Sequence, residues 1–136
     1  MIRIDLTKNY PRSPYDMLLG VVMLPRTLDK AKASVSGTLG EYHYNCPLDK
    51  AVLGFFGINH EDFLKKAAGL RTDEKMAEWV NTFHKSREEK DKFNDMMRHM
   101  EPDTPEKKQW LLEQIKSHGK HVKTYFDNID ADEKRF

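Results

Sequence analysis

The second half of the chain repeats one local pattern, in which a helix-capping residue precedes apolar side chains at helical spacing. Asn59, Thr72, Ser86 and Thr104 are residue types whose side chains accept hydrogen bonds from the free amides of a helix start. Apolar residues recurring at i, i+3, i+4 and i+7 form one face of a helix. The pattern predicts short amphipathic helices with these faces: Phe63, Leu64, Ala67, Ala68; Met76, Trp79, Val80, Phe83; Phe93, Met96, Met97, Met100; Trp110, Leu111, Ile115; and Val122, Tyr125, Phe126, Ile129.

Length and composition exclude several classes of protein. A chain of 136 residues corresponds to one domain, since domains average about 150 residues. The longest apolar run, Met17 to Leu24, is far shorter than the roughly 20 residues of a membrane helix, so we expect a cytoplasmic protein without a membrane partner. Cys46 is the single cysteine and excludes an internal disulfide. A net charge of +1, with both signs interleaved, argues against a nucleic-acid partner.

Charge is distributed unevenly along the chain. The first 60 residues contain 12 charged side chains, whereas the remaining 76 contain 33. Five of the seven glycines also lie in the first half. We interpret the charge-rich second half as a helical scaffold and expect any specific chemistry in the first half, where the backbone is least regular.

The N-terminal residues predict an extended arm followed by two helical segments. Ile2, Ile4 and Leu6 alternate with polar residues, as in a strand. Ser13-Pro14 is a helix-start signal, and the helix that it opens would carry Met17, Leu18, Val21 and Val22. Pro25 cannot donate the next backbone hydrogen bond, so the chain should turn there.

The helix that follows Pro25 has a charged face. Leu24, Leu28, Ala31 and Val35 form its apolar stripe, and the opposite face carries Arg26, Asp29, Lys30 and Ala33. Two interpretations stay open: a solvated face with local salt bridges, or one side of a ligand cleft. The second is favoured by the like charges of Arg26 and Lys30, which an anionic partner would relieve.

The segment from Gly37 to Asn45 is the one stretch of this half without helical periodicity. If it is extended, Glu41 and His43 point the same way, and a carboxylate can orient an imidazole that acts as acid or base. Tyr44 would supply a hydroxyl. Pro47 suits the first position of a helix closed by Gly57, which places Cys46 at its N-cap, where the helix dipole favours a thiolate.

Four interpretations of this segment compete. Cys46 could be a nucleophile or redox-sensing thiol with His43 as its base. His43, Cys46 and Asp49 could bind a metal together with a histidine from elsewhere. Backbone amides at Gly37 and Gly40 could approach an anion. The remaining interpretation is structural: glycines in turns, packed tyrosines and a buried cysteine.

Several motifs resemble a known family. They are Asp5-Leu6-Thr7-Lys8, Pro11-Arg12-Ser13-Pro14, Leu24-Pro25-Arg26, Asp29-Lys30-Ala31, Gly37-Thr38-Leu39-Gly40-Glu41-Tyr42, Cys46-Pro47-Leu48-Asp49 and Thr72-Asp73-Glu74. Together they are similar to the bacterial domain-of-unknown-function family 5069. The resemblance is specific from Asp5 to about Ile58 and looser afterwards. It implies no activity, cofactor or catalytic residue, but its polar motifs coincide with the first half and favour the cleft interpretation.

These observations predict a single all-α domain, 1–136, of six to eight short helices. Residues 1–12 would form an extended arm, 13–58 the motif-bearing half with an irregular or β-like insert around 37–46, 59–129 the scaffold and 130–136 a frayed tail.

The best hypothesis for function is a small-molecule-binding domain, with or without catalysis. An anionic ligand would lie between the 26–33 helix and the 37–49 loop, held by Arg26, Asp29, Lys30 and Tyr44. His43, Glu41 and Cys46 are the candidate catalytic residues, and no cofactor is indicated. One alternative is a non-catalytic interaction module or homodimer, favoured if Trp110 or Tyr125 is exposed. The other is a single-site metal protein using His43 and Cys46.

Overall fold

The computed structural model describes residues 4–101, 104–118 and 123–135. Within these residues the chain forms seven helices and one two-stranded antiparallel sheet, which confirms the predicted all-α class. The elements are β1 Met17–Leu18, β2 Val21–Val22, α1 Leu24–Ser36, α2 Pro47–Phe56, α3 His60–Gly69, α4 Asp73–Asn81, α5 Arg87–Arg98, α6 Pro105–His118 and α7 Tyr125–Asp132.

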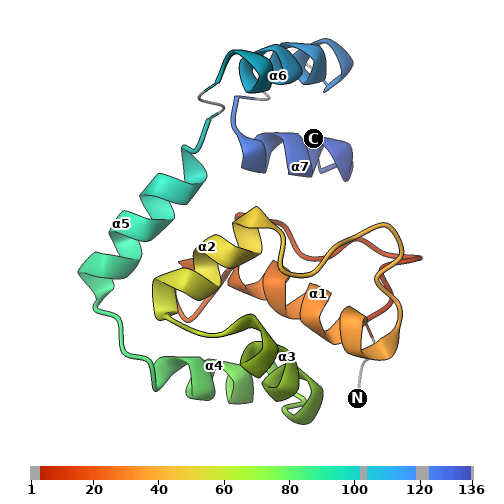
Figure 1. The fold of residues 1–136 in the computed structure, drawn as a ribbon. Coiled ribbons are helices and arrows are strands. Elements are labelled where there is room, and N and C mark those ends of the chain that lie inside the picture. The colour runs from red at the N-terminus through yellow and green to blue at the C-terminus, as the bar shows by residue number, and fades with distance from the viewer. Residues whose placement is uncertain (1–3, 102–103, 119–122, 136) are drawn as a thin grey trace.

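Helix α1 is the centre of the molecule. In Figure 1, α1 and α2 lie between the pair α3 and α4 and the pair α6 and α7, and α5 runs along one side to connect those pairs. Every residue from Val21 to Ala31 is buried, so α1 is covered all round rather than on one face. Among the largest fully buried side chains of the core that includes α1 are Phe63, Phe126 and Met76, which come from α3, α7 and α4.

The predicted helix carrying Met17, Leu18, Val21 and Val22 is wrong, because these residues form the β1–β2 hairpin. Met17 pairs with Val22 and Leu18 with Val21. Between the strands, Leu19 and Gly20 have φ of 55° and 72°, as in a type I′ turn. Spacings of one and four residues between apolar side chains suit either a helix or a short hairpin, so the periodicity did not distinguish them.

Most of the predicted helix ends are confirmed. The side chains of Asn59, Thr72 and Ser86 accept backbone hydrogen bonds at the starts of α3, α4 and α5. Cys46 is the N-cap of α2 and Gly57 ends that helix with φ 74°.

Two details of the helices differ from the prediction. Gly69 is the last helical residue of α3 and is followed by an extended Leu70, so it is not a left-handed cap. Val35, assigned to the buried stripe of α1, is 50% exposed, while Ala33 on the opposite face is buried. Directly after α1 the chain turns back, and the Thr38 amide donates to the Ala33 carbonyl at 2.8 Å, so the returning chain lies against Ala33 rather than Val35.

The C-terminal segment contributes to the core. Thr124 caps α7, whose Phe126 is fully buried, and the Trp110 ring lies 5.8 Å from the Tyr125 ring, which joins α6 to α7. Both rings are only partly exposed. The expected fraying after residue 129 differs from the structure, where α7 continues to Asp132 and Glu133 is buried. Residues 1–3, Val122 and Phe136 lie outside the described residues. Among the described helices, none has the length and apolar composition that crossing a membrane requires.

Candidate functional site

Three charged side chains of α1 are buried together. Arg26, Asp29 and Lys30, which we call the charged face of α1, are each at most 5% exposed. Charged side chains are rarely buried unless they are paired, and each of these three has an oppositely charged partner from another segment. The solvated-face interpretation is therefore wrong.

Arg26 forms a bidentate ion pair with Glu133. Its Nη1 donates to Oε1 at 2.9 Å and its Nη2 to Oε2 at 2.6 Å, the fork geometry in which arginine binds carboxylates most strongly. The Tyr42 hydroxyl donates to Glu133 Oε2 at 3.0 Å, and the Arg26 guanidinium lies 5.6 Å from the Tyr42 ring. Burial, followed by the charge of Glu133, raises the pKa of Tyr42 to about 12. The phenol therefore stays protonated and donates to the carboxylate.

Asp29 joins α1 to the N-terminal arm through Arg12. The backbone amide and Nε of Arg12 donate to Asp29 Oδ2 at 2.9 and 3.1 Å, and its Nη2 donates to Oδ1 at 2.9 Å. The same guanidinium donates through Nη1 to Asp73 Oδ2 at 2.6 Å. The hydrogen bond from Arg12 outweighs burial and lowers the pKa of Asp73. Arg12 thus connects the arm, α1 and α4.

Lys30 joins α1 to the start of α2. Its Nζ donates to Asp49 Oδ2 at 2.8 Å and lies 3.3 Å from Cys46 Sγ. Asp49 is fully buried and also accepts from Thr27 Oγ1 at 2.7 Å and from the Cys46 amide at 3.2 Å. The aspartate is therefore both the counterion of a buried ammonium and part of the helix cap.

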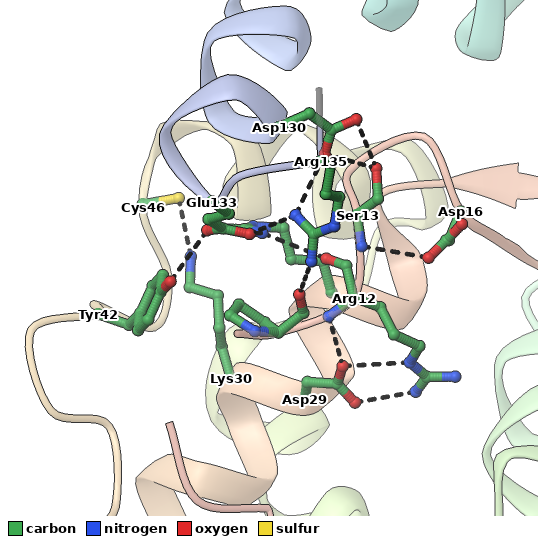
Figure 2. A network of polar contacts seen from close by, with 12 residues as sticks. Arg12, Ser13, Asp16, Asp29, Lys30, Tyr42, Cys46, Asp130, Glu133 and Arg135 are labelled. Atoms are coloured by element: carbon green, nitrogen blue, oxygen red, sulfur yellow. Dashed lines mark hydrogen bonds and ion pairs between the residues drawn. The ribbon is translucent and has the colours of Figure 1, made fainter. Parts of the chain in front are cut away.

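The last residues of the chain complete this network, and sequence reasoning missed them. Figure 2 shows Asp130, Glu133 and Arg135 converging on α1 and the arm. Ser13 Oγ donates to Asp130 Oδ1 at 2.8 Å, and Arg135 contacts Glu133, Asp130 and the Pro11 carbonyl. The acidic residues directly after the apolar stripe of α7 were a signal, but it does not identify their partners more than a hundred residues away.

Within the described residues, no hydrogen bond or ion pair joins His43 or Glu41, two of the three candidate catalytic residues, to the charged face of α1. His43 and Glu41 are exposed, and no hydrogen bond within the described residues joins them. The Tyr44 hydroxyl donates to the His60 carbonyl at 2.7 Å, away from Arg26, and burial raises the Tyr44 pKa. Cys46 alone of the three candidates lies against the charged face, through Lys30. The described part of the chain contains no cluster of three or more His, Cys, Asp or Glu side chains suited to a metal ion.

The arm is fastened to the irregular segment that follows α1. Leu6 donates its amide to the Thr38 carbonyl at 2.9 Å, and Thr38 Oγ1 donates to the Ile4 carbonyl at 2.6 Å. Gly40 has φ 61°, and a Cβ at this position would lie 3.2 Å from the Leu6 carbonyl oxygen. The close approach of these two backbones therefore requires glycine.

A cleft opens where the arm, this segment and the end of α7 meet. It has a volume of about 670 Å³ and is lined by Leu6, Thr7, Lys8, Asn9, Tyr10, Gly40, Glu41, Tyr42 and Asp132. Tyr42 belongs both to this lining and to the Arg26–Glu133 pair. The cleft is therefore built on the edge of the buried network, which holds its walls in place.

Comparison with known proteins gives one match. No curated protein matches the chain. The model of the family described as "Domain of unknown function (DUF5069)" matches residues 8–135, nearly the whole chain. That span includes Lys8, Asn9 and Tyr10 of the cleft lining, the charged face of α1 and Glu133, so both ends of the buried network lie inside the matched region. The chain belongs to the DUF5069 family.

Proposed function

We propose that this protein is a small-molecule-binding domain and that its ligand occupies the cleft between the arm and residues 40–42. The observation that carries this proposal is that the cleft has a polar lining from three distant segments, held in place by a buried ion-pair network. Pockets of several hundred Å³ that are formed before the ligand arrives are typical of small-molecule sites. The buried charges have a role in this proposal: they hold the cleft in shape.

The charged face of α1 is a poor site for the anionic ligand that the sequence suggested. Glu133 already neutralises Arg26, and Asp49 already neutralises Lys30. A free anion would have to displace a carboxylate of the chain and uncover side chains that are about 95% buried. The chain's own carboxylates thus occupy the place assigned to that ligand.

The cleft lining favours a ligand with hydroxyl or ammonium groups. Among the described residues that line the cleft, the carboxylates of Glu41 and Asp132 outnumber the ammonium of Lys8. The lining also includes the rings of Tyr10 and Tyr42, and aromatic faces attract cations. Thr7 and Asn9 add neutral hydrogen-bonding groups. A polyol or a small amine fits this chemistry better than a phosphate or a carboxylate.

The proposal can be tested by following backbone amide signals in NMR titrations. Three probes, putrescine, glucose and citrate, represent a cationic, a neutral and an anionic small molecule. We expect putrescine or glucose to shift amides of residues 6–10 and 40–42, and citrate to have no comparable effect there. Native mass spectrometry of freshly purified protein would show a co-purified molecule directly.

Glu41→Gln and Glu78→Gln form a matched pair of variants. Both glutamates are exposed, but Glu41 lines the cleft and Glu78 lies on α4 outside it. Glu41→Gln should weaken putrescine binding, and Glu78→Gln should not. Absence of amide shifts with all three probes, together with no co-purified molecule, would overturn the proposal. Binding of putrescine that both variants weaken equally would also overturn it, since this indicates general attraction to the surface.

A further inference from the structure

The β1–β2 hairpin and helix α5 enclose a second groove, distinct from the cleft and from the charged face of α1. Its volume is about 400 Å³. Met17 and Leu19 of the hairpin provide apolar surface, and Arg87, Lys90 and Arg98 of α5 provide cationic side chains. We call this the hairpin–α5 groove.

A buried asparagine holds the two sides of the groove together. The side-chain oxygen of Asn94 accepts from the Val22 amide at 2.9 Å, and its amide nitrogen donates to the Gly20 carbonyl at 2.8 Å. Asn94 is 4% exposed; its bond to Val22 is buried and its bond to Gly20 is part-buried. The groove is therefore formed without a ligand, and a partner would not have to order it.

The hairpin places an apolar side chain at an unusual backbone position. Leu19 has φ 55° at the first central position of the turn, where asparagine, aspartate or glycine is preferred. Its side chain packs partly on the core and also lines the groove. Beside it, Met17 is 53% exposed although it is a large apolar residue. Backbone strain that presents an apolar side chain is a feature of binding sites.

The cationic side chains of the groove have no counterions within the described part of the chain. Their neighbours on α5 differ, because Lys92 pairs with Glu88, and Lys85, just before the helix, pairs with Glu89. Arg98 Nη2 contacts Met17 Sδ at 3.5 Å rather than a carboxylate. Of the described residues that line the groove, Asp91 alone is acidic. The groove therefore carries excess positive charge next to apolar surface.

The spacing of the cations indicates the shape of a partner. Arg87, Lys90 and Arg98 lie within four turns on one side of α5, and 11 residues of helix span about 16 Å. An extended peptide covers that length with about five residues, at about 3.3 Å each. A single phosphate is too small to contact both ends. Among the described residues, no aromatic side chain lines the groove to stack on a base, which argues against nucleic acid.

We propose that the hairpin–α5 groove docks an extended acidic segment of a partner protein, about five residues long, with one apolar side chain placed over Met17 and Leu19. The acidic groups pair with Arg87, Lys90 and Arg98, and the apolar side chain covers the exposed Met17. This interaction is independent of the ligand proposed for the cleft, because the two sites share no residue.

Fluorescence anisotropy with a labelled peptide, Glu-Asp-Leu-Asp-Glu, tests the proposal on the full chain. We expect saturable binding that weakens with salt. Lys90→Glu and Arg98→Glu should each weaken it about tenfold, because each replaces an attraction by a repulsion. Lys92→Glu makes the same charge change on α5 outside the groove and should alter binding by less than about twofold. Circular dichroism of each variant checks that α5 is retained.

Further probes distinguish an acidic peptide from the other ligands that the groove could bind: a basic peptide, a nucleic acid or a second copy of the chain. The peptide Glu-Asp-Gly-Asp-Glu should bind more weakly than the leucine peptide, since it lacks the apolar contact, and Lys-Arg-Leu-Arg-Lys should not bind. Equal weakening by Lys92→Glu and Lys90→Glu would overturn the proposal, as would no binding at about 1 mM peptide. Tighter binding of a single-stranded oligonucleotide would assign the groove to nucleic acid instead. A dimer that Arg98→Glu dissociates would assign it to a second copy of the chain.

Discussion

The charged face of α1 and the exposed side of α5 have similar sequences but opposite environments. Both place acidic and basic residues at helical spacing, yet Arg26, Asp29 and Lys30 are buried, whereas Glu88 and Lys92 are about 80% exposed. The ion pairs of the two regions also differ in the sequence separation of their partners. On α5 they lie four residues apart, while Arg26 pairs with a glutamate 107 residues away.

This contrast shows that charge periodicity identifies a helix face but not its surroundings. A pair on an exposed helix is made within the helix and is screened by water. A buried pair removes two charges from water, and its loss leaves one of them without a partner in a low-dielectric interior. The two regions should therefore respond very differently to the same kind of substitution.

The largest effect is expected from Asp49→Asn. This change leaves the buried Lys30 ammonium without its carboxylate. The same carboxylate accepts hydrogen bonds from the Thr27 hydroxyl and the Cys46 amide. Removing one member of a buried ion pair costs about 4 kcal/mol, and we expect a loss of that size in the free energy of unfolding, measured with urea. Asp95→Asn on α5, whose partner His99 is exposed, is the matched control. Similar losses from both variants would contradict the comparison.

A slightly smaller effect is expected from Glu133→Ala. Arg26 loses both hydrogen bonds of its bidentate ion pair but keeps a hydrogen bond to the Arg12 carbonyl at 3.2 Å. We expect destabilisation of about 3 kcal/mol in urea unfolding. The double variant Arg26→Met with Glu133→Leu should recover much of this loss, because apolar residues of similar size can replace a buried pair. A double variant as unstable as Glu133→Ala would show that the pair itself is required.

The pH dependence of stability should report on the same pair. Burial alone would raise the pKa of Glu133, but hydrogen bonds and charge from Arg26, with Arg135 and Tyr42, lower it below the ordinary value of 4.5. A depressed folded-state pKa contributes stability that is complete above pH 4.5 and is lost as the pH falls toward the folded-state pKa. The free energy of unfolding should fall more steeply below pH 4.5 in the wild type than in Glu133→Gln. Parallel curves would show that Glu133 does not contribute.

The smallest effect is expected from Glu88→Gln on α5. Its pair with Lys92 has a separation of 3.5 Å and both side chains are in water. Pairs of this kind contribute little to stability. We expect the thermal unfolding midpoint to stay within experimental error of the wild type. A clear decrease would mean that exposed charge on α5 contributes to the fold and would weaken the contrast with α1.

Local features were predicted well because they depend on neighbouring residues. The side chains of the N-caps Asn59, Thr72 and Ser86 accept hydrogen bonds from amides two or three residues ahead. Such contacts are short in sequence, and the chemistry of the capping residue is sufficient to predict them. The hairpin at residues 17–22 was missed because the Asn94 side chain, more than 70 residues later, bonds to both Val22 and Gly20.

The candidate site was predicted only where it depends on residues that are close in sequence. The charged face of α1 and the place of Cys46 follow from spacing along one helix or at its start. Whether Arg26 meets water, a ligand or Glu133 depends on where α7 packs, and the sequence near Arg26 contains no information about that. Glu41 and His43 were paired by assuming an extended segment, but the segment turns at Gly40 and Glu41, where the Tyr42 amide donates to the Leu39 carbonyl.

The sequence by itself determined the all-α class, the helix starts and the existence of a charged face on α1, because capping and periodicity act over one or two turns. Only the tertiary structure decided that this face is buried, that its counterions come from the arm, α2 and the chain's end, and that a cleft lies at their junction. The physical reason is that a charge is stable in the interior only beside an opposite charge, and here the packing of distant segments supplies it.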